Sequence, residues 1–464
     1  MTMWKPDLAS RKGPLYLAIA DAMAASIEMG ELKAGDRLPP QRVLAFDLGL
    51  TVGTVTRAYA EAERRGLVTG EVGRGTYVRS TDPKRSQPLF SIRHGETTEM
   101  LDLSLNYPVE GDRGLLFAKA TAAIARDPAV ASLLNYQPAA GHPRHRAAAA
   151  ELAVRSGMPR DPERIVVCSG AQHGMTVVFG SLCRPGDVVL AEELTYPGII
   201  AVARLLNLRL RGVAIDGEGL RPDAFEAACR KGDARAVYCI PTYQNPTSAI
   251  MSESRRAEIA NIARKYGVIV VEDDVYGFLH DNHPKPLSAF LPESAYFVSS
   301  ASKSMMPALR MGFVMTPPSM TETIAETVRT TSWMASPIAA EVMTRWIEDG
   351  TAADLVRQHR AESRARLAMA ERILEGFPFQ SAPGTFHIWL PLPAPWSADD
   401  IVSRAAARNV RLIPARPFAV TGMVPQSLRL CLGSPRTREE LEIALGVVAQ
   451  LLHSVPTAAR FAVV

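Results

Sequence analysis

The sequence predicts an α/β protein in which a small helical domain precedes a large domain with a mostly parallel sheet. Residues 1–79 show helical periodicity and then two short alternating segments, whereas residues 80–98 are polar and lack periodicity. From residue 99 onward, short apolar strands alternate with helical segments, a pattern typical of a mostly parallel sheet covered by helices. We therefore predict a first domain at 1–79, a linker at 80–98 and an α/β domain at 99–464, whose last part, from about 351, is a smaller α+β portion.

The composition of the 464 residues is that of a globular protein, with 47% hydrophobic residues and 22% charged residues. The net charge is +4, and the first 80 residues hold 11 Lys and Arg against 9 Asp and Glu, so charge alone does not predict binding to nucleic acid. The five cysteines are scattered without a Cys-x-x-Cys pair, which indicates neither a disulfide framework nor a metal site. No signal peptide or membrane-length apolar run is present, so we expect a cytoplasmic protein that binds no membrane.

The first domain reads as three helices and a hairpin. Apolar residues at helical spacing predict a helix over 15–29, and Pro39-Pro40 opens a short second helix. Thr51 is a suitable N-cap for a third helix, from Val52 to about Arg65. Two strands then flank a glycine-rich turn, at 67–69 and 76–78.

Helix, turn, helix and hairpin in this order form a winged helix-turn-helix. In that motif one helix enters the major groove of double-stranded DNA, and the hairpin tip reaches the minor groove or the backbone. Basic and hydroxyl side chains at these positions are the candidate DNA contacts: Arg42, Thr51, Thr54, Arg57, Arg74 and Thr76. The alternative is a small helical docking module with a solvated polar face.

Six apolar segments predict strands of the large domain, and several chemically informative residues follow them. The strands are Ile165–Cys168, Val188–Ala191, Ala236–Ile240, Val268–Val271, Tyr296–Ser299 and Gly312–Met315.

A lysine among small hydroxyl residues is the most informative feature of this domain. Lys303 follows Ser300 and Ser302 just after a predicted strand, and Arg310 comes seven residues later. An amine can hold an aldehyde as an imine, while hydroxyls and a guanidinium can hold a phosphate, which are the needs of pyridoxal 5'-phosphate (PLP). Because most lysines are solvated surface charges, the prediction depends on companion residues.

Each companion has a physical task and a plainer structural explanation. Gly170, Ala171 and Gln172 open a helix after a strand and can bind the phosphate, although such turns are common. Tyr196 can stack on the pyridine ring, although it could equally be a half-buried loop residue. Asp273, at a strand end, can keep the pyridine nitrogen protonated, although acidic strand ends usually face water.

The order of these segments resembles the fold-type I aminotransferases over nearly all of residues 99–450. The resemblance assigns Asn245 to the phenolic oxygen of the cofactor and pairs Asp273 with Tyr276. It assigns Arg429 to a substrate carboxylate and Tyr136 to a segment that reaches into a partner subunit. Two residues depart from the family pattern, since Ser248 replaces a glycine and His145 replaces a leucine.

The block from Leu38 to Val78 resembles the GntR-type winged helix, except that Val52-Gly53 stands where many relatives carry an arginine. The two resemblances together are the architecture of the MocR family of GabR-like regulators. This implies a PLP-dependent transcriptional regulator that binds a double-stranded DNA operator as a head-to-tail homodimer.

The resemblance also implies a mechanism, which we state as a hypothesis. Lys303 would hold PLP as an internal aldimine, and a small amine or amino-acid effector, its carboxylate at Arg429, would displace the lysine by forming an external aldimine. The alternative is an active aminotransferase with an accessory winged helix, and a third possibility is a PLP-free protein that only binds DNA. The sequence names neither the effector nor the operator, nor does it distinguish activator from repressor.

Overall fold

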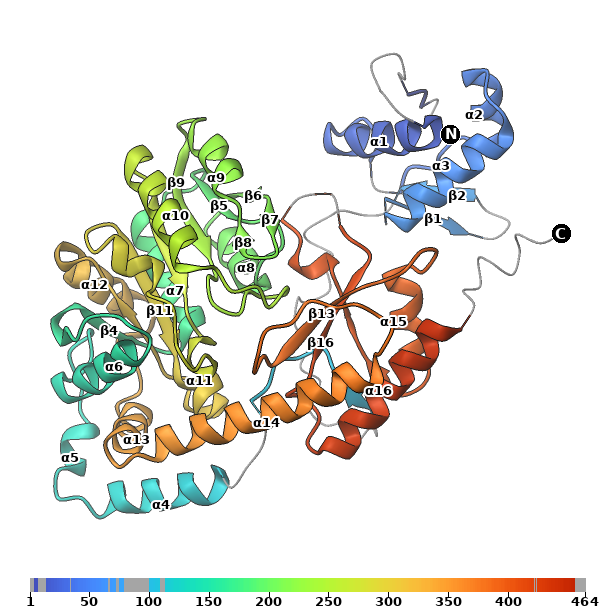
Figure 1. Cartoon of the computed structure of the whole chain (residues 1–464). Helices are drawn as coiled ribbons and strands as arrows, with labels where there is room; N and C mark the ends of the chain where they lie inside the picture. Colours follow the sequence, from blue (N-terminus) through green and yellow to red (C-terminus); the bar gives the residue numbers. More distant parts are fainter. Residues whose placement is uncertain are drawn as a thin grey trace. The chain divides into compact units, whose positions relative to one another are not determined.

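The computed structural model describes residues 4–6, 14–33, 35–65, 67–71, 75–78, 100–108, 113–420, 422 and 424–454. The chain divides into two compact units, Met1–Glu96 with Gly422–Val424, and Thr97–Thr421 with Pro425–Val464 (Figure 1). The predicted linker, 80–98, and Arg74 at the predicted hairpin tip lie outside the described residues.

The first unit contains the three helices and the hairpin that the sequence predicts. A compact apolar core joins these elements, and Ile19, Met23, Leu44 and Val55 are each fully buried within it. The two strands pair in antiparallel register from Val68 opposite Val78. The elements are α1 (Leu15–Glu28), α2 (Gln41–Leu48), α3 (Val52–Arg64), β1 (Val68–Glu71) and β2 (Gly75–Val78).

The second unit is built on a seven-stranded sheet of order β4-β12-β11-β10-β9-β5-β6. All neighbours are parallel except β12, which runs antiparallel to both β11 and β4. Six strands were predicted, but the edge strand β6 was not, because its charged residues Arg209 and Arg211 obscure the apolar pattern. The strands are β4 (Ile165–Cys168), β5 (Val188–Glu192), β6 (Arg209–Val213), β9 (Ala234–Cys239), β10 (Ile269–Asp273), β11 (Ala295–Ser300) and β12 (Gly312–Met315).

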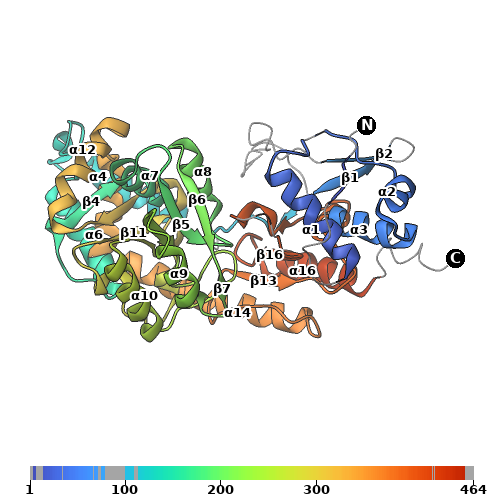
Figure 2. The same cartoon turned by 90° about the horizontal axis from the view of Figure 1, so that it is seen from above.

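Helices cover this sheet, as the alternating sequence pattern predicts (Figures 1 and 2). Three separate apolar clusters lie between the sheet and its helices, so strands such as β4 and β5 are buried along their whole length. A short hairpin, β7 (Ile215–Asp216) with β8 (Gly219–Leu220), follows β6. The helices are α4 (Arg113–Ala125), α5 (Val130–Leu133), α6 (Pro143–Arg155), α7 (Ala171–Leu182), α8 (Pro197–Leu205), α9 (Pro222–Cys229), α10 (Glu253–Tyr266), α11 (Ala301–Ser304), α12 (Thr321–Ser332) and α13 (Pro337–Glu348).

The long helix α14 (Thr351–Ile373) leads from the large sheet to a smaller α+β part (Figure 1). That part holds the antiparallel sheet β13-β16-β15 and an apolar cluster of its own. It also includes β3 (Leu101–Asp102), which pairs with β14, so the α+β part is not confined to residues after 351 as we predicted. The remaining elements are β13 (His387–Pro391), α15 (Ala398–Ala406), β14 (Val410–Arg411), β15 (Ile413–Pro414), β16 (Ser427–Cys431) and α16 (Arg438–His453).

Within the described part of the chain, no helix is both long and apolar enough to cross a membrane.

Candidate functional site

Lys303 lies in the single-turn helix α11, directly after the interior strand β11. Ser300 caps this turn by accepting a hydrogen bond from the Ser302 amide at 3.0 Å, and its own hydroxyl donates to the Met311 carbonyl at 3.0 Å. The ammonium of Lys303 donates to the backbone carbonyl of Asn106. Burial, assisted by repulsion from Arg429 and Arg310, lowers the pKa of Lys303 to about 8. A substantial neutral fraction of this amine therefore exists near neutral pH.

Asp273 ends β10, the strand next to β11, and is almost completely buried. The Tyr238 hydroxyl donates to its Oδ2 at 2.7 Å, whereas Oδ1 has no hydrogen-bond partner among the residues that the structure describes. Burial raises the pKa of Asp273 to about 7, and the neighbouring carboxylates of Asp274 and Glu272 add to this effect. A buried carboxylate oxygen without a partner is costly, so a cationic N–H placed there would stabilise it.

Gly170, which directly precedes Ala171 and α7, lies against Arg310. Gly170 has a φ of +85°, and a Cβ there would stand 2.7 Å from a terminal nitrogen of Arg310. Arg310 also donates to the Ser302 hydroxyl at 3.4 Å. A helix N-terminus, a hydroxyl and a guanidinium thus meet at one place, which is a donor set suited to a phosphate.

Gln172 and Tyr196 line the neighbouring side of the site. The Gln172 amide donates to the Gly198 carbonyl at 3.1 Å, and any side chain at position 198 would collide with the Tyr196 ring. Burial, with a contribution from Asp273, raises the pKa of Tyr196 to about 12. The phenol therefore lies close enough to Asp273 to sense its charge.

Arg429 on β16 reaches from the smaller α+β part toward Asn245. Its guanidinium donates to the Asn245 side-chain oxygen at 2.8 Å and to the Ser104 carbonyl at 2.5 Å, and it lies 4.8 Å from the centre of the Phe418 ring. The Nε of this buried arginine has no partner within the described residues. Arg429 is thus the one predicted substrate-binding residue that the single chain places in the cluster.

Tyr276 belongs to a buried hydrogen-bonded chain that the sequence did not reveal. The Asn106 amide donates to the Tyr276 hydroxyl at 3.0 Å and lies 3.0 Å from His387 Nδ1, while His387 Nε2 lies 3.1 Å from the Gln244 carbonyl. Burial lowers the pKa of His387 to about 3, so the ring is neutral and donates through Nε2. Asn106 therefore joins Lys303 to Tyr276.

Ser248 shows how the chain accommodates its departure from the family glycine. Its φ is +64°, in the left-handed region that glycine favours. Its hydroxyl donates to the His387 carbonyl at 2.6 Å and contacts Thr385 at 3.1 Å. These bonds offset the backbone strain and tie the Asn245 loop to β13.

Tyr136 is not part of the cluster around Lys303 within one chain. It is 78% exposed, and its ring packs 5.4 Å from that of Trp333, which is 54% exposed.

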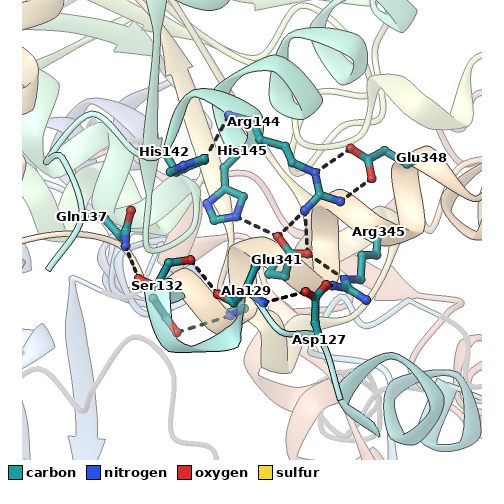
Figure 3. A network of polar contacts seen from close by, with 12 residues as sticks. Asp127, Ala129, Ser132, Gln137, His142, Arg144, His145, Glu341, Arg345 and Glu348 are labelled. Atoms are coloured by element: carbon teal, nitrogen blue, oxygen red, sulfur yellow. Dashed lines mark hydrogen bonds and ion pairs between the residues drawn. The ribbon is translucent and has the colours of Figure 1, made fainter. Parts of the chain in front are cut away.

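A network of polar contacts fixes the segment that carries Tyr136 (Figure 3). Gln137 donates to the Ser132 carbonyl at 2.6 Å, and Asp127 accepts from the Ala129 amide at 2.9 Å and pairs with Arg345. Glu341 accepts from Arg345 and Arg144, each at 2.7 Å, and lies 3.2 Å from His145.

The buried Glu341 is the centre of this network. Burial would raise the pKa of Glu341, but hydrogen bonds from Arg345, Arg144 and His145 lower it below its usual value. Burial lowers the pKa of His145, so the ring acts as a neutral donor to Glu341. The histidine that replaces the family leucine is thus accommodated as a buried hydrogen-bond partner.

The predicted DNA contacts all belong to the first unit. Arg42 is exposed at the start of α2, and Arg57 is exposed on α3 and lies 4.9 Å from the Tyr16 ring centre. Thr51 is the N-cap of α3, as predicted, and its oxygen accepts from the Thr54 amide at 3.2 Å and lies 2.9 Å from the Thr54 hydroxyl. Thr76 is half-buried on β2.

Three residues of the site escaped prediction: Asn106, Tyr238 and His387. Tyr238 reads as an ordinary buried strand residue, and Asn106 and His387 lie 281 positions apart, so no local pattern joins them. Only their contacts with Asp273, Tyr276 and Lys303 reveal them.

The two units match two known families. Residues 98–448 match aminotransferase class I and II, and residues 15–78 match the bacterial regulatory proteins of the gntR family. The chain belongs to the GntR-type regulators that carry a fused aminotransferase class I/II domain, which is the MocR-like arrangement.

Similar proteins include both regulators and enzymes. The uncharacterized HTH-type transcriptional regulator YdeF of Bacillus subtilis is 30% identical over 97% of this chain and 96% of its own length. The 2-aminoadipate transaminase of Thermus thermophilus is 28% identical over 71% of this chain and 83% of its own. An archaeal alanine:glyoxylate aminotransferase structure aligns with a TM-score of 0.71 at 23% identity, covering 77% and 91% of the two chains, and shows the shared fold.

Proposed function

We propose that this protein is a PLP-dependent transcriptional regulator that senses a small amine or amino acid. Two residues carry the proposal: Lys303, whose pKa is lowered to about 8, and Asp273, whose buried Oδ1 lacks a hydrogen-bond partner in the described part of the chain. These features fit an aldehyde cofactor with a cationic ring nitrogen, in a chain that also carries a gntR-family domain.

The residues present fit PLP along its whole length. Gly170, Ala171, Ser300, Ser302 and Arg310 would hold the phosphate, and Asp273 would face the ring nitrogen. When bound, PLP supplies an aldehyde that condenses with amines and a ring that accepts electrons. Further contacts would come from Gln172, Tyr196, Asn245 and Tyr276.

Arg429 would bind the carboxylate of an amino-acid effector. Its Nε has no hydrogen-bond partner in the described structure, and its contact with Asn245 links the smaller α+β part to the loop after β9. A carboxylate accepts two parallel hydrogen bonds from a guanidinium, so an effector here would compete with the Asn245 and Ser104 oxygens. The effector regulates DNA binding only if it binds one arrangement of the smaller α+β part and the large sheet more tightly than another.

The test compares the wild-type protein with the Lys303→Ala protein. The wild-type protein should bind PLP with visible absorbance, and borohydride should fix the cofactor on Lys303. The Lys303→Ala protein should lose both the fixation and the response of operator binding to effector. An effector response that survives in the Lys303→Ala protein would contradict the proposal.

An aminotransferase is the second candidate function, because Arg429 contacts Asn245 and one relative is named a transaminase. Mixing the PLP-loaded protein with candidate amino acids separates the two. Release of a keto acid in repeated turnover favours the enzyme, whereas a stable spectral change without keto acid favours the sensor. A colourless protein would support neither.

We further propose a head-to-tail homodimer acting in the cytoplasm on double-stranded DNA, with 1–79 as the DNA-binding domain, 80–98 as the linker and 99–464 as the sensing domain. The exposed pair Tyr136 and Trp333 supports the dimer, since large exposed aromatic side chains commonly mark interfaces. Leu134, which is 69% exposed, adds apolar surface to the same loop. Exposed Arg42 and Arg57 would contact the operator.

A further inference from the structure

A cavity lies next to α11, the helix that carries Lys303. It has a volume of about 370 Å³ and is enclosed by α6, the start of α14, and the residues that flank Lys303. Lys303, Asp273, Asn245 and Arg429 do not line it, and Ser300 is the one residue that it shares with those assigned to PLP. We call it the α6–α14 cavity. Its volume falls within the range of about 300–1,000 Å³ that is usual for small-molecule sites.

Its walls are mainly apolar. Leu152 comes from α6, Met305 follows α11, and Ala352, Ala353 and Val356 come from the first turns of α14. Such walls favour a ligand with an apolar body, because burying apolar surface is favourable.

Cationic side chains border the cavity. Arg155 is exposed and makes no ion pair within the described residues, whereas Arg357 pairs with Asp354 on its own helix. Arg360 donates to the carbonyls of Phe278 and His280, both at 2.8 Å, and its third nitrogen lies 3.5 Å from Asp281. Arg155 is therefore the cation at this border that favours an anion.

The single carboxylate of the lining does not offset this charge preference, because its oxygens are already engaged. Asp274 is 2% exposed, and its Oδ2 accepts from the Ser156 hydroxyl at 2.8 Å. Its Oδ1 lies 2.9 Å from His283 Nε2, and His283 also lies 2.6 Å from the Pro284 carbonyl through its other nitrogen. Both ring nitrogens therefore act as donors, and His283 and Asp274 form an internal ion pair.

We propose that the α6–α14 cavity binds a small amphipathic monocarboxylate. Its carboxylate meets Arg155, and its apolar body lies against Leu152 and Met305.

Occupation of this cavity is coupled to the Lys303 site. Ser304 and Met305 line the cavity and directly follow Lys303, and Ser299 and Ser300 line it from the preceding strand. A ligand here therefore touches the turn that positions the lysine. Coupling between two sites is reciprocal, so PLP and the carboxylate must change each other's affinity by the same factor. This coupling rests on the proposed role of Lys303, whereas the binding itself does not.

The binding test is calorimetric titration of the PLP-free full-length protein with 4-phenylbutyrate and with its neutral analogue 4-phenylbutan-1-ol. The acid should bind with one site per chain, and the alcohol should bind on the order of tenfold more weakly, since a charge-assisted contact is lost. Undetectable binding of the acid, or equal binding of acid and alcohol, would overturn the proposal.

Variants locate the ligand. Arg155→Gln should weaken binding of the acid about tenfold, and Ala353→Phe should abolish it by filling the cavity. Arg372→Gln, an exposed arginine farther along α14, is the matched control and should bind as wild type. Unchanged binding by Arg155→Gln overturns the proposal, and this exposed position decides the matter even if Ala353→Phe misfolds.

One further pair of measurements separates this proposal from the proposed function. In the PLP-free state, Lys303→Ala should bind 4-phenylbutyrate as wild type, and loss of binding would place the ligand at the Lys303 site instead. PLP-loaded wild-type protein should differ in affinity from the PLP-free form by at least about threefold. Equal affinities of the two forms for 4-phenylbutyrate would overturn only the coupling between the sites. A protein that binds 4-phenylbutyrate but takes up no PLP would refute the proposed function and leave the cavity proposal intact.

Discussion

At the scale of single residues, burial moves the pKa values of two oppositely charged groups, Lys303 and Asp273, toward neutrality. The pKa of Lys303 falls to about 8 and that of Asp273 rises to about 7, because the interior disfavours the charged form of each. Both groups therefore change protonation near physiological pH, which is a common property of functional sites.

The lowered pKa of Lys303 predicts how its reactivity depends on pH. The neutral fraction of an amine with a pKa of about 8 rises about tenfold between pH 7 and pH 9 and then levels off. To measure this, PLP is added to the PLP-free protein and the imine is reduced with borohydride after short reaction times. Peptide mapping then gives the rate at which Lys303 is modified, and this rate should show the plateau. A rate that continues to climb through pH 10, as for an exposed lysine, would contradict the prediction.

The hydrogen bond from Tyr238 to Asp273 predicts a second effect. Tyr238→Phe removes a donor that lowers the pKa of Asp273, so the carboxyl should become easier to protonate and a poorer partner for a cationic ring nitrogen. We expect PLP affinity to fall on the order of tenfold, measured by absorbance titration. Tyr296→Phe is the control, because Tyr296 is likewise buried in the sheet and its hydroxyl makes no hydrogen bond in the described structure. Equal losses in both variants would show that only packing was disturbed.

At the scale of elements, the start of α3 depends on its cap. Thr51 satisfies the Thr54 amide at 3.2 Å, one of the donors that a helix N-terminus leaves without an internal partner. The sequence identified this cap correctly, since a threonine preceded a periodic segment.

Replacement of the cap should destabilise the first unit. Thr51→Ala should lower its free energy of unfolding by about 1 kcal/mol, seen as a lower midpoint in chemical denaturation of the full chain. Operator affinity should fall as well, because the same turn carries the candidate DNA contacts. Thr51→Ser keeps the hydroxyl and should retain most of the stability, and a Thr51→Ala protein as stable as wild type would exclude this role.

At the scale of the whole molecule, exposed aromatic surface predicts self-association. Trp333 has a φ of +66° and stacks against Tyr136, so the turn presents both rings to solvent rather than burying them within one chain. The Glu341 network fixes the loop on which Tyr136 stands (Figure 3).

A charge placed in this surface should separate the subunits. Trp333→Glu should shift the protein from dimer to monomer in sedimentation experiments, because an interface core excludes unpaired charges. Leu205→Glu, at a comparably exposed position that is 69% accessible, should leave the assembly unchanged. A wild-type protein that is already monomeric at micromolar concentration would contradict the prediction.

The sequence by itself determined the order of the elements and the residue types at the strand ends. Helical periodicity, the Thr51 cap and the apolar strands are local signals, so they predicted the elements of the first unit and six strands of the second to within a few residues. Lys303, Asp273 and Arg429 could be selected because the residues beside each match a family segment. β6 was missed since an edge strand with charged residues lacks a continuous apolar pattern.

Only the tertiary structure decided which distant residues meet. Asn106, which lies 170 positions before Tyr276, links that tyrosine to Lys303. Tyr238 supplies the hydrogen bond to Asp273, and β3 joins the α+β part far along the chain. Burial, which moves the two pKa values toward neutrality, is likewise a property of the packed fold and not of any segment. Local propensity fixes the elements, but contacts between remote segments exist only once those elements have packed.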